Sequence, residues 1–416
     1  MIKRNGLILL IMAVLISCDM VAGGTTGLTD SANWVDVHGA GSQRSDPKTG
    51  DPTEYSEGHG PQGDAIRIYN LVRPVRSFSS ADLPYSIVDT NQTTRFDNYG
   101  AVSDTTVFAG QDADYSSLQA SYTDNNDGTV SDNHTGLMWQ QNPGEKMTWD
   151  EAYEDLESMN LAGYDDWRIP TIKELYSLIQ FSGRDIAPEA TSANDPFIDT
   201  DYFDFSYGNL DAGERIIDSQ YMSSTKYVST TMDGDETVFG VNFADGRIKG
   251  YGLKMGNREK DFYVIFVRGN EEYGKNNFID NGDGTISDLA TGLMWMQEDA
   301  GPMNWGEALT YSEDLEYAGY DDWRLADAKE LQSIVDYSRS PDTSDSAAID
   351  PLFHTTVVEN EAGEEDYGFY WSSTTHATSS SSNEGASAAY VAFGRSLGNM
   401  ANLQMPGMSG PEGGPG

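Results

Sequence analysis

The apolar residues of this chain fall into a pattern that predicts an amphipathic helix near residue 150. Trp149, Ala152 and Leu156 recur at helical spacing, which places them on one stripe that can be buried. Thr148 and Glu151 stand three residues apart just before this stripe. That spacing is a capping box, in which each side chain satisfies a free backbone amide at the start of a helix. We therefore expect a helix that begins after Thr148.

The same helix-start signal occurs a second time further along the chain. Asn304 and Glu307 repeat the capping pair, and Gly163 and Gly319 are expected to end the two helices, since glycine favours the left-handed backbone of a helix stop. A second helix is predicted in each half. The capping pairs of these second helices are Thr171 with Glu174 and Asp327 with Glu330.

These repeated signals belong to a duplication with an offset of 156 residues. DNNDGTVSDNHTGLMWQ (124–140) aligns with DNGDGTISDLATGLMWM (280–296), and AGYDDWR occurs at 162–168 and again at 318–324. This period is too long for a solenoid and indicates two domains of about 140–150 residues. The Asp-Gly stretches between β-like runs are read as hairpin turns. They are not read as calcium loops, because their glycine comes one position too early for an EF-hand.

The YDDWR segment between the helices is interpreted as structural. Its tryptophans are expected to fill the core, and its arginines to hold loop carbonyls or a nearby carboxylate; a catalytic role for the Asp-Asp pair is the less favoured alternative. The residues assigned a structural role are Trp139, Trp167, Arg168, Trp295, Trp323 and Arg324.

The composition of the chain excludes some classes of ligand. The 416 residues include 67 Asp and Glu against 25 Lys and Arg, a formal net charge of −42. So acidic a surface repels nucleic acid, heparin-like glycans and anionic lipids. Nucleic-acid binding is therefore set aside, and the membrane is expected to be reached through a lipid anchor only.

The first 18 residues read as a secretory leader. Lys3 and Arg4 precede an apolar run from Leu7 to Ile16, which is too short for a spanning helix. Leu15-Ile16-Ser17-Cys18 resembles the bacterial lipobox, and Cys18 is the one cysteine in the sequence. We expect a lipoprotein of the bacterial cell envelope, periplasmic or surface-exposed; a plain signal peptide with an incidental cysteine is the alternative. The remaining chain then has no thiol for disulfides or zinc sites.

The second copy lacks a closing strand. The first copy ends with FYVIFVRG (262–269), and the nearest match to that strand is IRIYNLVRPVR (66–76), near the other end of the chain. Either residues 31–76 complete the second domain, or they are the relic of a truncated third copy. The predicted organisation is a leader over 1–18, a completing segment over 31–76, a connecting segment over 77–121, domains over 122–270 and 278–396, and a flexible tail over 397–416.

The succession DNGDGT, TGLMW, a helix, AGYDDWR, KEL and YWSST resembles the Lcl C-terminal domain family of bacterial extracellular modules. The resemblance covers nearly all of 122–269 and 278–395. It implies an α+β fold of tandem C-type lectin-like domains, each with two helices, a small antiparallel sheet and long irregular loops.

Two properties of that family bear on this chain. Its members often carry a cysteine in the first helix and another in the last strand; these positions fall on Leu156 and Phe266 in the first copy, and on Ser312 and Pro74 in the second. Its characterised sugar ligands include sulfated glycans, which are held by a basic surface. Because this chain is acidic, such a ligand is not expected here.

The expected function is that of a lipid-anchored binding protein, adhesin-like or lectin-like, that recognises carbohydrate or another surface polymer. The alternatives are a structural envelope protein that binds protein partners and an extracellular hydrolase; catalysis is the less favoured. The ligand should lie on the long loops, at 183–256 in one copy and at 339–383 with 31–65 in the other. Tyrosines proposed to stack on sugar, several of them expected in the core, are Tyr202, Tyr207, Tyr251, Tyr367 and Tyr370. The glycine-rich segments around His38 and His59 are read as solvated, turn-rich loops. The alternative is a cation site with calcium as cofactor and Asp46, Asp51 and Asp64 as oxygen ligands.

Overall fold

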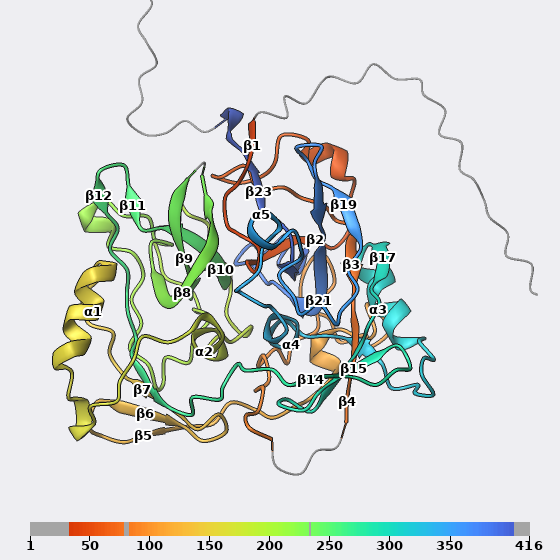
Figure 1. Ribbon diagram of the computed structural model, residues 1–416. Coiled ribbons are helices and arrows are strands. Elements are labelled where there is room, and N and C mark those ends of the chain that lie inside the picture. The colour runs from red at the N-terminus through yellow and green to blue at the C-terminus, as the bar shows by residue number, and fades with distance from the viewer. Residues whose placement is uncertain (1–32, 79–82, 233, 403–416) are drawn as a thin grey trace, which may run out of the picture.

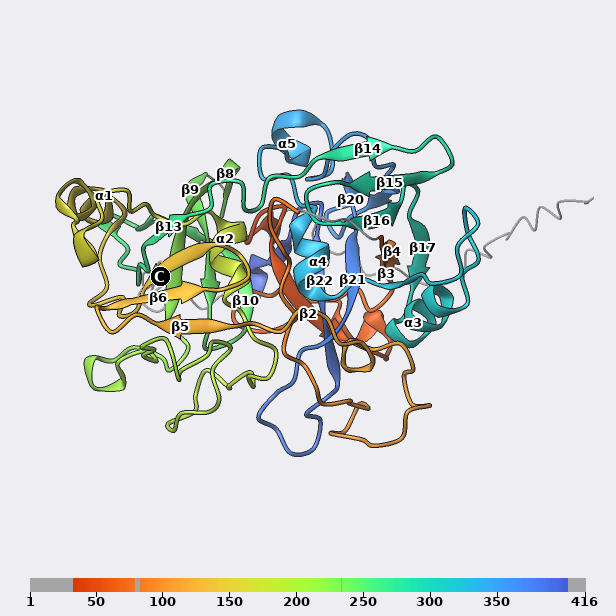
Figure 2. The ribbon, with the colours of Figure 1, turned by 90° about the horizontal axis from the view of Figure 1, so that it is seen from below.

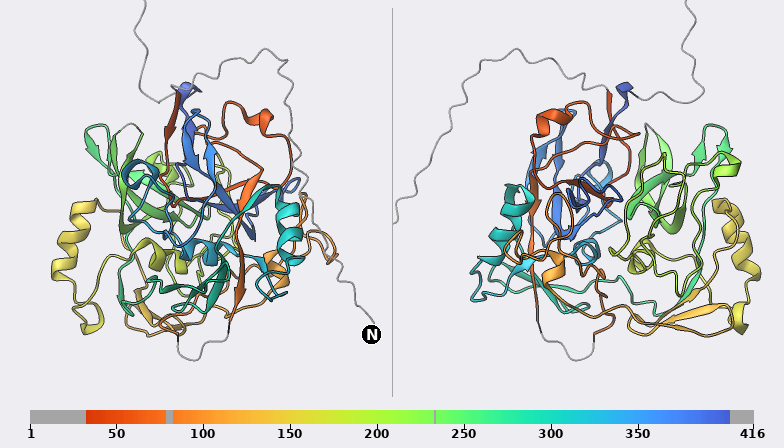
Figure 3. Two further views of the ribbon diagram at one scale, coloured as in Figure 1. Left: turned by 45° about the vertical axis from the view of Figure 1, so that its right-hand side comes forward. Right: turned by 180° about the vertical axis from the view of Figure 1, so that it is seen from behind.

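The computed structural model describes residues 33–78, 83–232 and 234–402. It has short helices and many strands in several sheets, and the two copies of the repeat form two units that stand side by side (Figures 1 and 3). The leader and Cys18 lie outside the described residues. Within them, no helix is both long enough and apolar enough to cross a membrane.

The first unit has a four-stranded sheet at its base and a three-stranded meander above it. The basal sheet consists of β5 (Tyr122–Asp124), β6 (Thr129–Asp132), β7 (Leu137–Gln140) and β13 (Val267–Gly269). The meander consists of β8 (Gln220–Thr231), β9 (Asp235–Asn242) and β10 (Arg247–Gly252), with a small hairpin of β11 (Lys254–Met255) and β12 (Arg258–Glu259) after it. The helices are α1 (Trp149–Ser158) and α2 (Ile172–Ser177).

The second unit repeats this plan with strands from both ends of the chain. Its basal sheet consists of β14 (Phe278–Asp280), β15 (Thr285–Asp288), β16 (Leu293–Met296), β4 (Pro74–Ser77) and β18 (Arg324–Leu325). Its other strands are β1 (Trp34–Asp36), β2 (Gln43–Pro47), β3 (Asn70–Val72), β17 (Ala300–Met303), β19 (Val357–Glu359), β20 (Glu365–Tyr367), β21 (Phe369–Thr375), β22 (Ser387–Ala392) and β23 (Leu397–Asn399). Its helices are α3 (Trp305–Glu313), α4 (Ala328–Ser333) and α5 (Pro341–Ser344).

All four predicted capping boxes are present, at the starts of α1, α2, α3 and α4. The predicted helix ends are wrong. The first helices stop at Ser158 and Glu313, five and six residues before the glycines that were expected to end them. Gly163 and Gly319 have positive φ, at 80° and 84°, but they serve the turn that leads into YDDWR.

A single eight-stranded sheet connects the two units. Its order is β17-β3-β21-β22-β2-β10-β9-β8, so β2 lies between β22 of the second unit and β10 of the first. The junction with β10 is the pairing of Gln43 with Ile248. Each copy has a small antiparallel sheet of its own at its base, as expected, but the shared sheet was not expected: through it the copies have a continuous backbone hydrogen-bond network.

β4 holds in the second unit the position that β13 holds in the first. Val75 and Arg76 of β4 face Trp295 and Met294 of β16, as Val267 and Arg268 of β13 face Trp139 and Met138 of β7. Both arginines carry the same side-chain contacts. Arg76 Nε donates to Asp322 (2.6 Å) and Arg268 Nε donates to Asp166 (2.7 Å).

The repeated AGYDDWR segment is held by the same side-chain contacts in both units. The indole Nε1 atoms of Trp167 and Trp323 each donate to a carbonyl six residues earlier, at 3.1 Å. Arg168 pairs with Glu174 and Arg324 with Glu330, the glutamates of the following capping boxes. One Asp of each Asp-Asp pair is bound by the arginine of the closing strand. The segment therefore locks the basal sheet to the second helix.

The two ends of the described chain meet. β1 pairs antiparallel with β23, with Trp34 opposite Asn399, and the two strands lie together at the top of Figure 1. The predicted start of the flexible tail at residue 397 is therefore wrong, because Leu397–Asn399 form a buried strand; residues 403–416 lie outside the described part.

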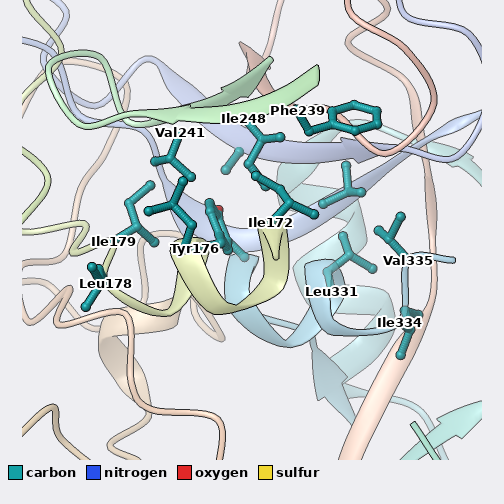
Figure 4. Close-up of a cluster of buried hydrophobic side chains, with 14 of the residues drawn as sticks. Ile172, Tyr176, Leu178, Ile179, Phe239, Val241, Ile248, Leu331, Ile334 and Val335 are labelled. Atoms are coloured by element: carbon teal, nitrogen blue, oxygen red, sulfur yellow. The ribbon is translucent and has the colours of Figure 1, made fainter. Parts of the chain in front are cut away.

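The main core lies where the short helices meet the shared sheet. α1 and α3 lie at the two outer ends of the molecule, whereas α2 and α4 lie in the middle (Figure 2). Figure 4 shows Ile172 and Tyr176 of α2 and Leu331 of α4 under Val241 and Ile248 of the sheet. These side chains are buried in one cluster that includes residues of both units. Trp139 and Trp295 are fully buried, and Trp167 and Trp323 nearly so.

At the positions where relatives often have cysteines, Leu156 and Phe266 pack in the same apolar cluster.

Candidate functional site

A cavity of about 870 Å³ lies where the loops of the two units meet. From the first unit it is lined by residues 185–188, by Arg215 and by β10; from the second unit it is lined by 59–64 and 378–380. These segments belong to the long loops in which the sequence places the ligand. The glycine-rich HGPQGD segment forms one rim, closed by a β-bridge between His59 and Asp64.

β10 supplies the floor because its side chains alternate between the two faces of the sheet. Ile248 points into the core and is fully buried (Figure 4). Arg247, Lys249 and Tyr251, at alternate positions, line the cavity. Arg44 of the neighbouring strand β2 joins them.

The lining is rich in cations. Five basic side chains face three carboxylates; the cations are Arg44, Arg215, Arg247, Lys249 and Lys260, and the carboxylates are Asp64, Asp185 and Asp245. Arg215 also pairs with Asp218, which does not line the cavity, so the local excess amounts to one cation. Even this excess is opposite in sign to the net charge of a chain with 67 acidic and 25 basic residues.

Each lining carboxylate already has a cationic partner. Asp64 pairs with Arg44, and Asp245 pairs with Lys249. Asp185 Oδ2 lies 2.8 Å from Arg247 Nη2. These pairs orient the cations and leave no carboxylate of the wall free to act as an acid or base.

Lys260 differs from the other cations. Across the described residues no carboxylate lies within 4.0 Å of its Nζ, which stands 4.5 Å from the ring centroid of Tyr251 and 5.2 Å from that of Phe262. Burial lowers the pKa of Lys260 to about 8; Asp218 opposes this shift, and the nearby cation Lys249 adds to it. An anion in the cavity would supply the missing counter-charge.

His38 lies behind the rim and is buried. Its Nε2 is 2.9 Å from Asp64 Oδ1 and 2.8 Å from Arg44 Nη1. Burial, assisted by Arg44, lowers the pKa of His38 to about 4. The histidine is therefore neutral at physiological pH and positions Asp64 and Arg44.

The proposed calcium ligands do not converge. Asp46 is fully buried, and its Oδ2 accepts from the amides of Arg67 and Ile68. Asp51 caps a short 3-10 turn at Pro52–Tyr55, and Asp64 is held by Arg44. Within the described ranges no cluster of three His, Cys, Asp or Glu residues could hold a metal ion. The calcium hypothesis is therefore wrong for these three residues, since each carboxylate is used by its own local structure.

The proposed stacking tyrosines have separate positions. Tyr370 is 1% exposed and Tyr251 is 8% exposed, so their faces are covered by protein, although Tyr251 contributes to the cavity wall. The other three are half-buried. Tyr202 packs on the main core, Tyr207 donates to the Asn194 carbonyl at 2.7 Å, and Tyr367 donates to the Asp345 carbonyl at 3.1 Å.

The net charge of the chain does not indicate the cations of the cavity. One local pattern does: Arg247, Lys249 and Tyr251 stand at alternate positions, with apolar Ile248 and small Gly250 between them. Such alternation puts two cations and an aromatic ring on one face.

Comparison with known proteins gives a family and no closer neighbour. The family model described as Lcl C-terminal domain matches residues 128–268 and 284–405, more than half of the chain. The chain belongs to this family, in two tandem copies. No curated protein and no solved structure matches the chain.

Proposed function

We propose that this protein is a lipid-anchored binding protein of the bacterial cell envelope, with C-type lectin-like modules, and that its ligand is the carboxylate- or sulfate-bearing end of a glycan. The leader and Cys18 support the location. The basic residues that line the cavity between the copies are the observation that supports an anionic ligand.

The excess of lining cations favours an anionic ligand. Charged hydrogen bonds to carboxylate or sulfate are stronger than neutral ones, and Lys260 is a cation without a carboxylate partner among the described residues. The acidic remainder of the surface favours a short anionic segment over a long polyanion. Charges more than about 8 Å away are largely screened at physiological salt, so the local cations dominate for a ligand that fits inside.

Binding is favoured over hydrolysis for a structural reason. A glycan hydrolase needs two carboxyl groups of different protonation on either side of the scissile bond. Here Asp64, Asp185 and Asp245 are each held by a cation of the wall. Because both units line the cavity, the two copies supply one shared site, and avidity between two separate sites is not required.

The test compares short probes of equal length by calorimetry: a heparin tetrasaccharide, a galacturonic acid tetramer and neutral maltotetraose. At least one anionic probe should bind more tightly than maltotetraose, with affinity that falls as NaCl is raised. Affinity should also fall as the pH rises through about 8, because Lys260 then loses its charge.

Lys260→Gln should weaken binding of that anionic probe by roughly tenfold, as expected for one charge-assisted hydrogen bond. Lys226→Gln is the matched control, since Lys226 is exposed and pairs with Glu236 away from the cavity. Equal binding of neutral and anionic probes, or equal effects of the two substitutions, would refute the proposal. No binding of any glycan by folded protein would favour a protein partner instead.

A further inference from the structure

A second cavity, of about 510 Å³, opens in the second unit and shares no lining residue with the first. It lies among β1, the turn at 52–55, β3, β19 and the start of β21. Its volume falls in the range of small-ligand sites, about 300–1,000 Å³.

Aromatic side chains dominate its wall. Trp34, Tyr55, Tyr69 and Phe369 all line it, together with aliphatic residues. Phe369 is buried, whereas Tyr69 is 46% exposed. A large aromatic ring left in the open at the mouth of an apolar cavity presents a face to which a ligand can bind.

The backbone before Tyr69 is held in an unfavourable conformation. Ile68 has φ of 62°, a left-handed value that is rare for a β-branched residue. The buried carboxylate of Asp46 accepts from the amides of Arg67 and Ile68 and from Asn70 Nδ2 (3.1–3.4 Å). Asp46 thus fixes the turn that directs Ile68 inward and Tyr69 outward. Strained backbone held by its surroundings is concentrated at functional sites.

The polar groups of the wall indicate what a ligand must offer. Arg67 makes a two-pronged pair with Glu361, at 2.9 and 3.0 Å, and stacks 3.8 Å from the ring centroid of Phe369. Its third nitrogen, Nη1, and Asn70 Oδ1 have no exposed surface, so a ligand does not reach them. The exposed polar side chains of the lining are Thr53, Ser56 and Glu359. Their hydroxyl and carboxylate groups can exchange hydrogen bonds with a hydroxyl group of a ligand.

The charge of the lining argues against an anionic ligand. Arg67 is its one cation, against the carboxylates of Glu359 and Glu361, so an anion is disfavoured. The Arg67 guanidinium already occupies the face of Phe369, and Tyr69 remains the exposed ring.

We propose that this aromatic cavity binds an uncharged pyranose ring of a glycan, with the C–H face of the sugar on Tyr69 and hydroxyl groups toward Thr53, Ser56 and Glu359. This inference goes beyond the function proposed above: it adds a second site, built by the second unit and the N-terminal segment, for a ligand of different charge. Together the two sites would bind a neutral sugar unit and an anionic sugar unit of the same surface polymer.

The experiment uses saturation-transfer NMR on the whole protein with cellobiose, maltose and diacetylchitobiose as probes. At least one neutral disaccharide should bind, and Tyr69→Ala should lower its affinity roughly fivefold through lost stacking. Tyr99→Ala is the matched control, because Tyr99 is 73% exposed and does not line this cavity. Lys260→Gln should leave disaccharide binding unchanged, so a failure of the anionic site would not be mistaken for a failure of this one.

Three outcomes would overturn the inference. The first is that folded protein binds none of the disaccharides. The second is that Tyr69→Ala binds them as tightly as the unchanged protein does. The third is that choline, or a peptide of residues 19–32, binds in their place and competes at Tyr69. The last result would identify the cavity as a site for an organic cation or for the chain's own N-terminal segment.

Discussion

Arg73 provides a sharp test of how strongly the N-terminal segment is built into the second unit. It lies between β3 and β4 and is 1% exposed. Its guanidinium donates to the carbonyls of Met296 (2.8 Å), Gln297 (2.7 Å) and His354 (2.7 Å). Its Nη2 also lies 3.7 Å from the buried carboxylate of Asp299. One side chain thus joins segments more than 220 residues apart in sequence.

Arg73→Met should lower the free energy of unfolding by about 3–5 kcal/mol, the usual loss when one partner of a buried ion pair is removed. The substitution keeps an apolar stem but leaves three carbonyls without their donor. It also removes the cation beside Asp299, whose carboxylate keeps hydrogen bonds from Thr356 and Tyr370. Arg76→Met, on the same segment, is the matched control. Arg76 pairs with Asp322, whose side chain is 57% exposed, so its loss should amount to about 1 kcal/mol or less.

The assay is urea unfolding followed by tryptophan fluorescence. Adding Asp299→Asn to Arg73→Met should recover about 1 kcal/mol, because the unpaired buried charge is then removed. Equal losses for Arg73→Met and Arg76→Met, or a loss below about 1 kcal/mol for Arg73→Met, would refute the idea that this buried arginine fastens the segment to the second unit.

Two further predictions concern stability. Burial raises the pKa of Asp46 to about 6; the corresponding stabilisation, about 3 kcal/mol, is complete below the unfolded pKa and is lost as the pH rises through 6. The urea midpoint should therefore fall between about pH 4 and pH 7, the range that spans the unfolded and folded pKa values, and less so in Asp46→Asn. An unchanged pH dependence in the variant would contradict this assignment. Gly246 and Gly256 have similar positive φ, 68° and 63°, but an added Cβ would lie 2.5 Å from the Phe197 ring in the first case and in open space in the second. Gly246→Ala should lower the melting temperature clearly more than Gly256→Ala, and equal shifts would show that backbone strain alone decides.

The sequence alone was enough for the features that depend on neighbours along the chain. The four capping boxes need only residues three apart, and all four helix starts were predicted. The duplication follows from aligning the chain with itself, and it led to the family. The helix ends were not predictable in this way: α1 and α3 stop where the chain turns into YDDWR, and that turn depends on the docking of Trp167 and Trp323 against the basal sheets.

Tertiary structure decided the site. Whether Tyr370 is a stacking platform or a core residue depends on how tightly the strands around it close, which its own neighbours in sequence do not report. Asp46, Asp51 and Asp64 are close in sequence, yet one holds the turn at Ile68, one caps a 3-10 turn and one pairs with Arg44. The basic cavity exists because β2 pairs with β10 of the other unit and so brings Arg44 beside Arg247 and Lys249. Composition is a sum over the whole chain, whereas a ligand meets only the charges within a screening length, and folding selects which charges those are.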